Sequence, residues 1–302
     1  MDINTLTLAD VTKFTEEQAR EYLEAIRWPK GADCVHCGSP KVTRLGGKAA
    51  KWGLYKCRDC RKKFTVMVGT IFEDSHIPLR SWVIAFHMMC SSKKGYSAKQ
   101  LQRNLGLKSY KSAWHMAHRI RHAMATGDFQ KPLQGEVEID ETYVGGRVIG
   151  KGVKAGKDNK APVVSLVERG GSVRSFHVAN VTAENLKPIV RQHVAEQAQV
   201  NTDDASVYRF VIPESMGHDV VEHKRKEYSR LEGGRLITTN TVEGYFSLLK
   251  RGVYGTFHSI SKKHLPRYLA EFDFRYNARK VEDGERTALA IQGAEGKRLM
   301  YK

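Results

Sequence analysis

The sequence lacks the features that would place a chain in a membrane or export it. It has no run of about 18 to 20 apolar residues, which a membrane-spanning helix requires, and no amphipathic anchor segment. Met1 is followed by an acidic and polar stretch without the basic start and apolar core of a secretory signal. Tandem repeats and low-complexity tracts are also absent, while 41% of the residues are hydrophobic. These absences predict a folded, soluble protein that stays in the cytoplasm and has no membrane partner.

Acidic residues are scarce in one part of the chain. Between positions 41 and 122 there are 18 Lys and Arg residues against 3 Asp and Glu residues, so this block carries most of the net charge of +17. Lysine and arginine gain free energy by displacing counterions from phosphate, and such a block therefore favours a nucleic-acid partner. A solvated surface is the alternative interpretation. We expect much of the nucleic-acid binding to lie in this block.

Cysteine is rare as well, but four of the five cysteines form a pattern. They make two C-x2-C pairs separated by nineteen residues, a spacing typical of four-cysteine zinc sites: Cys34, Cys37, Cys57 and Cys60. Four thiolates complete a tetrahedral ion and leave no position open for catalysis, so we predict one structural Zn2+. Disulfides or a redox motif are alternatives, which a reducing cytoplasm and the presence of two pairs disfavour. Cys90 lies in an apolar helical run and is assigned to core packing.

Helical periodicity dominates much of the first part of the chain. Residues 9–28 are predicted to form a short helix, for which Thr15 is a candidate cap. Aromatic and β-branched runs in residues 34–72 predict a small β-rich unit. Residues 79–124 are predicted to be helical, and a turn at 106–109 separates the last two helices. This pair fits a DNA-binding helix-turn-helix and also an ordinary helical hairpin. Basic residues favour the former, and DNA contacts are expected from Lys108, Lys111, Arg119 and Arg121.

The second half begins with three strand-like segments, GEVEIDETYVGG, PVVSLVERGG and GSVRSFHVAN. Gly170 and Gly171 are predicted to form the hairpin turn between the second and third. A helix, the strand QVNTDD, a short helix and the strand HDVVEH follow, and residues 240–280 are mainly helical. This order is that of the RNase H-like fold, in which the first and fourth strands end side by side. The predicted fold class is α/β, with an RNase H-like mixed sheet flanked by helices after a small zinc ribbon and a helix-turn-helix-like module.

Asp140 stands in the middle of the first of these strands. Aspartate is disfavoured there by propensity, so its placement indicates a specific role. Strand alternation places Asp140 on one face with Glu136 and Glu138, whereas Glu141 belongs to the opposite face. We therefore select Asp140 over Glu141 as a candidate catalytic acid.

Two further acids stand at the ends of predicted elements. Asp203 and its neighbour Asp204 end the strand QVNTDD, and Glu243 begins the final helix, two turns before Lys250. Phosphodiester cleavage by two divalent ions requires carboxylates that converge from such positions. Each acid alone would be assigned to the surface or to a helix cap, but together they predict a metal site.

These segments resemble the insertion-sequence DDE transposases of the ISXO-like branch, which carries an N-terminal zinc ribbon. The resemblance extends over about residues 34–279, most of the chain. Its most specific parts are the ribbon, EIDETYVGG, the strand end TDD, and the segment TNTVEGYFSLLKRGVYGTFHSISKKHLPRYLAEFDFRYNAR.

The resemblance implies catalytic and DNA-binding residues. Asp140, Asp203 and Glu243 would be the catalytic acids and would hold two Mg2+ or Mn2+ ions. Asp204 is the alternative to Asp203. Asn240 is the alternative to Glu243, because related transposases can use asparagine as the third member. DNA contacts are expected from Lys250, Arg251, Lys262 and Lys263.

By this resemblance the protein is expected to be the transposase of an insertion sequence. It would bind terminal inverted repeats, hydrolyse phosphodiesters at the element ends and join the 3′-hydroxyls to target DNA. Two ends must be held together, so a homodimer or larger assembly is expected in the DNA complex, at the nucleoid of a bacterial cell. A non-catalytic DNA-binding regulator and an RNase H-like nuclease or resolvase are alternative interpretations. Whether the ribbon contacts DNA or only stabilises the fold is open.

The expected organisation has five segments. They are a helical lead-in at 1–32, the zinc ribbon at 33–75, the helix-turn-helix-like module at 76–128, the catalytic domain at 129–282 and a C-terminal tail at 283–302.

Overall fold

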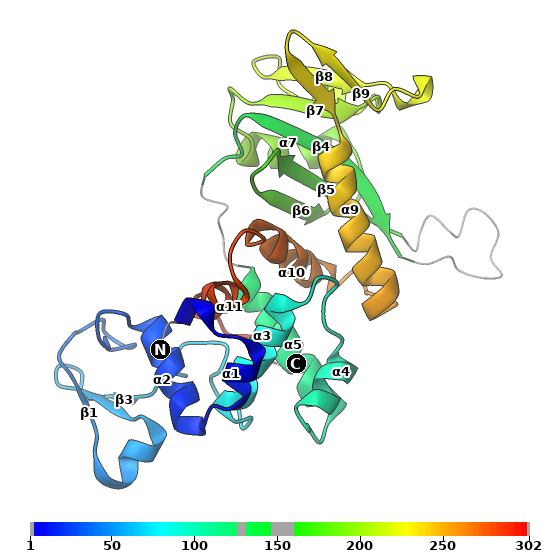
Figure 1. The fold of residues 1–302 in the computed structure, drawn as a ribbon. Helices are drawn as coiled ribbons and strands as arrows, with labels where there is room; N and C mark the ends of the chain where they lie inside the picture. Colours follow the sequence, from blue (N-terminus) through cyan, green and yellow to red (C-terminus); the bar gives the residue numbers. More distant parts are fainter. Residues whose placement is uncertain (1–2, 126–130, 146–159, 301–302) are drawn as a thin grey trace. The chain divides into compact units, whose positions relative to one another are not determined.

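The computed structural model describes residues 3–125, 131–145 and 160–300, which form two compact units (Figure 1). Unit 1 contains residues 3–92, 96–125 and 278–300, and unit 2 contains residues 93–95, 131–145 and 160–277. The boundary predicted at 128/129 lies outside the described residues, and the five-segment division stays a prediction. In the part of the chain that is described, no helix is both long and apolar enough to cross a membrane.

Unit 1 begins with helices that cap themselves. After the 3-10 turn η1 (Ile3–Thr5), helices α1 (Leu8–Thr12) and α2 (Glu16–Arg27) each start with a threonine capping box. Thr15 accepts a hydrogen bond from the backbone N–H of Gln18 at 3.2 Å, while its own N–H donates to the Gln18 side chain at 2.9 Å. The predicted cap is therefore confirmed, and α1 is a helix in addition to the one predicted there.

The segment around the cysteine pairs forms the predicted small β-rich unit. Strands β1 (Val42–Arg44), β2 (Tyr55–Cys57) and β3 (Lys63–Phe64) make an antiparallel sheet, and the 3-10 helix η2 (Gly47–Trp52) links the first two. Its small core consists of two of the cysteines and Phe64, with Trp28 and Tyr55 packed against it. So few apolar side chains cannot by themselves stabilise a fold, and a bound metal ion is the usual supplement.

The helical part of unit 1 follows the predicted pattern. It contains α3 (Leu79–Ser91), α4 (Ala98–Asn104) and α5 (Tyr110–Met124), and the turn before α5 includes Gly106 at φ +62°. The segment predicted as a C-terminal tail contains a further helix, α11 (Asp283–Gln292), which packs against α3 and α5. Unit 1 is thus built from both ends of the described chain.

Unit 2 is a five-stranded mixed sheet in the order β6-β5-β4-β7-β8. The strands are β4 (Glu136–Val144), β5 (Ala161–Glu168), β6 (Val173–His177), β7 (Gln199–Asp203) and β8 (Gly217–Val221). Neighbours β6-β5-β4 are antiparallel, whereas β4-β7-β8 are parallel. The predicted order of strands and helices is confirmed, and the first and fourth strands of the unit lie side by side.

Helices cover both faces of this sheet. On one face, α7 (Ala183–His193) and α8 (Tyr208–Val211) bury the side chains of Val137, Ile139 and Val200. On the other face, α9 (Asn240–Gly252) and α10 (Leu265–Asn277) pack over β5 and β6. The π-helical turn η4 (Val253–Phe257) follows α9 directly in the chain. Strand alternation therefore directs the even-numbered residues of β4, Asp140 among them, toward the α9 face.

A hairpin that was not predicted precedes α9. After the turn η3 (His223–Arg225), strands β9 (Ser229–Glu232) and β10 (Arg235–Thr238) pair in antiparallel fashion. Gly233 and Gly234 both have positive φ, at +56° and +79°, as a two-residue hairpin turn requires. Arg235 lies 2.9 Å from Asp219 of β8, so the hairpin is fixed to the sheet edge directly before α9 begins.

Candidate active site

Two of the predicted catalytic acids lie on neighbouring strands. In the parallel pairing of β4 with β7, Ile139 is opposite Thr202, so the next residues along the two strands are Asp140 and Asp203. Asp203 is the last residue of β7, and its carboxylate accepts a hydrogen bond from the backbone N–H of Ala205 at 3.1 Å. The sheet therefore places both carboxylates at the same edge.

The third predicted acid approaches from the helix above this edge. Glu243 lies in the first turn of α9, where Thr239 donates a hydrogen bond to its Oε1 at 3.1 Å. The Nε2 atom of His223 lies 3.4 Å from the same oxygen and 3.3 Å from the Thr239 hydroxyl. From the sequence, His223 had no assigned role. It belongs to the segment before the hairpin, and only the chain path brings it to Glu243.

The pKa of Asp140 responds to its burial and to the neighbouring acids. Burial raises the pKa of Asp140 to about 7, and the negative charges of Glu141, Asp203 and Glu243 act in the same direction. The backbone N–H of Glu141, which donates to Asp140 at 2.7 Å, opposes the shift. A group of carboxylates with too little positive charge nearby is an environment that a divalent cation relieves. Oxygen ligands of this kind suit Mg2+ or Mn2+.

Glu141 is directed away from this group, as strand parity predicted. Its carboxylate accepts a hydrogen bond from the hydroxyl of Tyr208 in α8 at 2.6 Å. Burial raises the pKa of Glu141 as well. Since α8 covers the opposite face of the sheet from α9, Glu141 is not positioned to share a metal ion with Glu243.

A buried carboxylate joins the strand of Asp140 to the helix of Glu243. Glu138 is fully buried and accepts hydrogen bonds from the backbone N–H groups of Thr241 and Val242, at 2.7 and 3.0 Å, and from the Thr241 hydroxyl at 2.8 Å. The guanidinium of Arg169 donates to it at 3.0 and 3.1 Å. The negative charge thus lies at the positive end of α9 and is balanced by arginine. Parity placed Glu138 on the Asp140 face, but its helix-capping role was not predicted.

The two alternative acids have different surroundings. Asp204 forms an ion pair with Lys224 at 2.7 Å, and this lysine lowers the pKa of the Asp204 carboxyl. Asn240 is the exposed first residue of α9, and its backbone N–H donates to Thr238. The negative charges of Asp203 and Glu243 raise the pKa of Asp140, which favours Asp203 over Asp204 and Glu243 over Asn240.

The basic residues predicted to contact DNA fall into two groups. Six are exposed, on the α4–α5 turn and the start of α5, on the last turn of α9 and before α10: Lys108, Lys111, Lys250, Arg251, Lys262 and Lys263. Arg119 and Arg121 are buried instead. The guanidinium of Arg119 donates to the carbonyl of Leu299 at 3.1 Å, and that of Arg121 lies 3.5 Å from the carbonyl of Tyr96. These two side chains bind backbone oxygen inside unit 1, which corrects the expectation that they reach phosphate.

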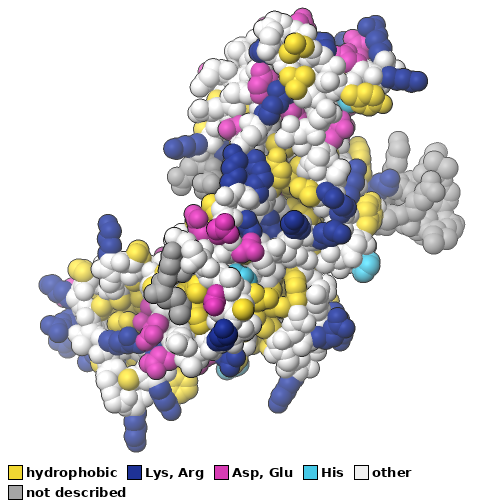
Figure 2. Space-filling model, in the orientation of Figure 1, with side chains coloured by type: hydrophobic (Ala, Val, Ile, Leu, Met, Phe, Trp, Pro, Cys, Tyr) yellow, Lys and Arg dark blue, Asp and Glu magenta, His cyan; other side chains and the backbone are white. Residues whose placement is uncertain are grey.

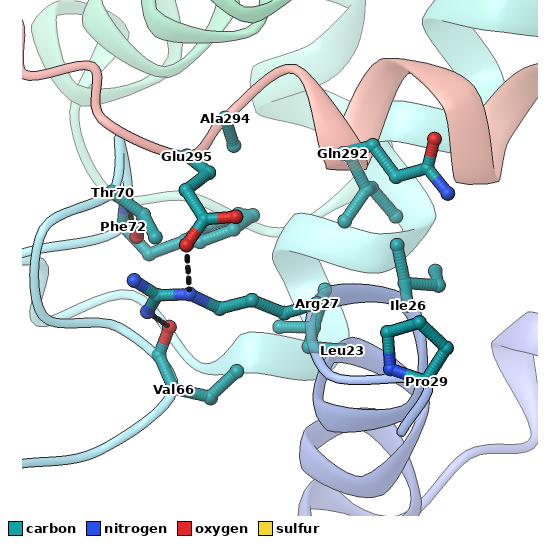
Figure 3. Close-up of a pocket in the computed structure, with 11 residues that line it drawn as sticks. Leu23, Ile26, Arg27, Pro29, Val66, Thr70, Phe72, Gln292, Ala294 and Glu295 are labelled. Atoms are coloured by element: carbon teal, nitrogen blue, oxygen red, sulfur yellow. Dashed lines mark hydrogen bonds and ion pairs between the residues drawn. The ribbon is translucent and has the colours of Figure 1, made fainter. Parts of the chain in front are cut away.

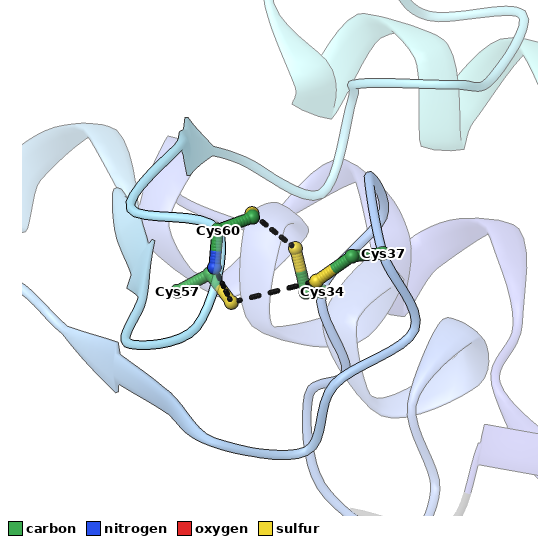
Figure 4. A group of neighbouring side chains, drawn as sticks. All are labelled: Cys34, Cys37, Cys57 and Cys60. Carbon is green, nitrogen blue, oxygen red and sulfur yellow. Dashed lines mark hydrogen bonds between the residues drawn. The ribbon is translucent and has the colours of Figure 1, made fainter.

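The four cysteines converge at one point of the ribbon (Figure 4). Their sulfurs all lie within 4.8 Å of one another, with Cys34 and Cys60 at 3.6 Å and Cys37 and Cys57 at 3.7 Å. Tetrahedral zinc with Zn–S bonds of about 2.3 Å places its sulfurs about 3.8 Å apart, so this group fits one structural Zn2+. Among the described residues, the three candidate acids do not form a second group as tight as this one.

One cavity of about 230 Å3 lies in unit 1 (Figure 3). It is lined by α2, the segment after β3, the end of α11 and the residues that follow this helix. The ion pair of Arg27 with Glu295, at 3.2 Å, crosses it. Arg27 also donates to the carbonyls of Val66 and Val68. The groups that line the cavity are therefore used in holding these segments together, and none of the candidate catalytic residues lines it.

Comparison with known proteins finds two families that match separate parts of the chain. Residues 14–63 match the family described as transposase zinc-ribbon domain, and residues 132–277 match the ISXO2-like transposase domain. A protein of Halobacterium salinarum, named as an uncharacterized protein in transposable element ISH50, is 29% identical over 283 residues, which cover 87% of this chain and 92% of that protein. No solved structure matches the chain significantly.

Proposed function

Because the chain carries an ISXO2-like transposase domain behind a transposase zinc ribbon, as the sequence motifs predicted, we propose that it is the DNA transposase of an insertion sequence. In this proposal it cuts phosphodiesters at the ends of the element and joins the free 3′-hydroxyls to target DNA. The observation that carries the proposal is the placement of Asp140 and Asp203 on the paired strands β4 and β7, with Glu243 in the first turn of α9 on the same face of the sheet.

The topology of unit 2 supports an RNase H-like catalytic domain. Its sheet has three antiparallel strands followed by two parallel ones, and the first strand lies between the second and the fourth. This order brings the Asp140 strand beside the strand that ends at Asp203. Helix α9 then crosses the same face with Glu243 in its first turn. Carboxylates presented by a sheet and one helix are held more rigidly than carboxylates on loops.

Each residue of the proposed site has a distinct task. Asp140, Asp203 and Glu243 would hold two divalent ions, and such ions would supply activation of the attacking water or hydroxyl and stabilisation of the departing oxygen. Glu138 keeps β4 and α9 at a fixed separation. Lys250, exposed two helical turns after Glu243, binds the phosphates of the terminal DNA. Water and then a DNA hydroxyl are the nucleophiles, so no covalent bond between protein and DNA forms.

DNA recognition is assigned to unit 1. Copies of the protein are proposed to assemble with one another when they bind DNA. The ribbon, with one structural Zn2+, and the helix pair α4–α5 would bind the terminal inverted repeats, because the basic surplus of the sequence lies there. Two ends must be joined in one reaction, and a homodimer or larger assembly on DNA follows from that requirement.

The test is strand transfer by purified protein with DNA that flanks the gene. Asp140→Ala should abolish cleavage and joining in Mg2+ while DNA binding is retained, because the carboxylate is needed only for chemistry. Asp219→Asn is the matched control, since Asp219 lies on the same sheet but is already paired with Arg235. Cleavage by Asp140→Ala at the parental rate would refute the proposal.

The alternative functions predict different results in the same assay. Metal-independent binding without any cleavage by the parent would identify a DNA-binding regulator. Cleavage of RNA–DNA hybrids or four-way junctions in preference to element ends would identify a nuclease or resolvase.

A further inference from the structure

The loop that joins β1 to β2 in the ribbon exposes a tryptophan. This loop contains η2 (Gly47–Trp52), and the side chain of Trp52 is 66% exposed. The next most exposed aromatic residue in the described part of unit 1, Tyr110, is 50% exposed. An indole has a large apolar surface whose burial is favourable, and an exposed one is typical of binding surfaces.

The exposed position of Trp52 is built into the fold. Buried Arg20 of α2 donates to the carbonyl of Lys51 at 2.7 Å and is itself paired with Glu17 at 3.0 Å. Gly53 follows at φ +59°, and a Cβ at this position would lie 2.2 Å from the Arg20 side chain. The base of the loop is closed by a hydrogen bond from the N–H of Leu45 to the carbonyl of Leu54 at 2.8 Å. A loop fixed in this way loses little conformational entropy when it binds a partner.

The charge around Trp52 specifies the kind of partner. Residues 41–63 contain nine Lys and Arg residues, all exposed, against the single acid Asp59. Figure 2 shows Lys and Arg side chains projecting from the lobe formed by the ribbon. Two of the nine, Lys48 and Lys51, belong to the same loop, and the Lys51 ammonium lies 5.0 Å from the Trp52 ring centroid. An exposed aromatic ring beside an ammonium group, on a strongly basic surface, suits a polyanion with apolar bases and sugars.

We propose that residues 45–54, here called the Trp52 loop, contact duplex DNA directly. Lys48 and Lys51 bind backbone phosphates, while the Trp52 ring packs against sugar and base atoms in a groove. This inference rests on the proposed function, and it assigns the DNA contact of the ribbon to one loop and to three named side chains. The lysines and the tryptophan should affect DNA binding in different ways. The affinity supplied by phosphate contacts of the lysines falls as the salt concentration rises, whereas the apolar contact of the tryptophan does not depend on salt.

The test measures DNA affinity by fluorescence anisotropy over a series of salt concentrations. The probes are a fluorescein-labelled duplex from the DNA that flanks the gene and a duplex of mixed sequence and equal length. Trp52→Ala should weaken binding about tenfold or more at fixed salt, because the apolar burial of the ring is lost, and should leave the salt dependence unchanged. A plot of the logarithm of the association constant against the logarithm of the salt concentration has a negative slope. The double variant K48Q/K51Q should make this slope less steep by about 1.8, as expected for two lost phosphate contacts.

Two variants serve as controls. Trp52→Phe should retain most of the affinity because it keeps an aromatic ring. Phe210→Ala removes a side chain in unit 2 that is equally exposed, at 67%, and should bind DNA like the parent. Since Trp52 is exposed, its substitution should not alter the melting temperature.

The inference would be overturned if Trp52→Ala bound both duplexes with parental affinity. A change in oligomeric state by light scattering, with DNA affinity intact, would also overturn it and would assign the loop to a contact between copies of the chain. These outcomes leave the proposed function standing. A parent protein that bound neither duplex would refute the proposed function itself, together with this inference.

Discussion

Glu138 accepts two hydrogen bonds from Thr241, one from its backbone N–H at 2.7 Å and one from its hydroxyl at 2.8 Å. This contact joins the middle of β4 to the first turn of α9. Asp140 lies two residues after Glu138, and Glu243 lies two residues after Thr241. The separation between these two acids is therefore set by a buried carboxylate that need not touch the substrate.

Replacing this carboxylate should impair catalysis without impairing DNA binding. Glu138→Gln retains one acceptor oxygen but turns an amide NH2 toward Arg169 or toward the N–H groups of α9. We expect the free energy of unfolding to fall by about 1 to 3 kcal/mol. Strand transfer should slow by about tenfold to a hundredfold through misplacement of Glu243. Glu232→Gln, at an exposed hairpin position, is the control for loss of a surface ion pair. Parental strand-transfer rates in Glu138→Gln would show that the contact does not position the site.

The third residue of the proposed site can be identified by comparing Glu243 with Asn240. Glu243→Gln should lower the rate of strand transfer by about a hundredfold or more. Mutating a residue that only hydrogen-bonds to a metal ligand typically costs about tenfold to a hundredfold, and loss of the ligand itself should cost more. It should also raise the Mg2+ concentration needed for half-maximal rate. Asn240→Ala, at an exposed helix start, should retain most of the activity. The opposite ranking of the two variants would transfer the role to Asn240.

Removal of zinc should disrupt the ribbon. The sheet around the four cysteines has a very small apolar core, so metal binding is expected to supply much of its folding free energy. Cys57→Ser should lose stoichiometric zinc, measured by a colorimetric metal assay, and should lower DNA affinity. Cys90→Ala removes a buried cysteine of α3 and should keep one zinc per chain. Full zinc content in Cys57→Ser would exclude the four-cysteine site.

Buried Asp273 should give unit 2 a defined pH dependence of stability. Its carboxylate accepts hydrogen bonds from Ser175 at 2.7 and 2.8 Å and from the Tyr245 hydroxyl, but burial dominates and raises its pKa from 3.8 to about 6. The folded state therefore holds this proton more tightly than the unfolded state. The resulting stability is fully present below about pH 4 and is lost as pH rises toward 6.

Denaturant unfolding of the parent and Asp273→Asn across this interval would measure the effect. The asparagine cannot ionise, so the parent's stability relative to the variant should decrease by on the order of 2 kcal/mol between about pH 4 and pH 7. Asp283→Asn, which changes an exposed carboxylate, should show no such trend. A difference that stayed constant with pH would place the Asp273 pKa near its ordinary value.

The sequence predicted those parts of the structure that depend on local pattern. Strand alternation separated Asp140 from Glu141, and the structure directs Glu141 to Tyr208 on the opposite face. Gly170 and Gly171 lie in the turn between β5 and β6 as expected, with Gly170 at φ +75°. The spacing of the two C-x2-C pairs was enough to predict the four-cysteine group, because two short turns can bring four sulfurs together without contacts from distant segments.

The parts that were missed depend on contacts between distant segments. Helical periodicity identified α5 but could not show that Arg119 would meet the carbonyl of Leu299, 180 residues later. Glu138 became a helix cap only because α9 crosses the sheet at that point. The β9–β10 hairpin did have a local signal, since Gly233 and Gly234 lie between strand-like runs. The many charged residues around that pair masked the strand pattern.

The contribution of residues 283–300 to unit 1 has a consequence for the order of folding. The N–H of Ile71 donates to the carbonyl of Ala294, and the N–H of Gly296 donates to the carbonyl of Gly69. During translation, all of unit 2 has therefore left the ribosome before unit 1 receives its last helix. The unit that is begun first is completed last, contrary to the usual N-terminal-first order. A chain that terminated between residues 277 and 283 would contain every described element of unit 2 and an unfinished unit 1.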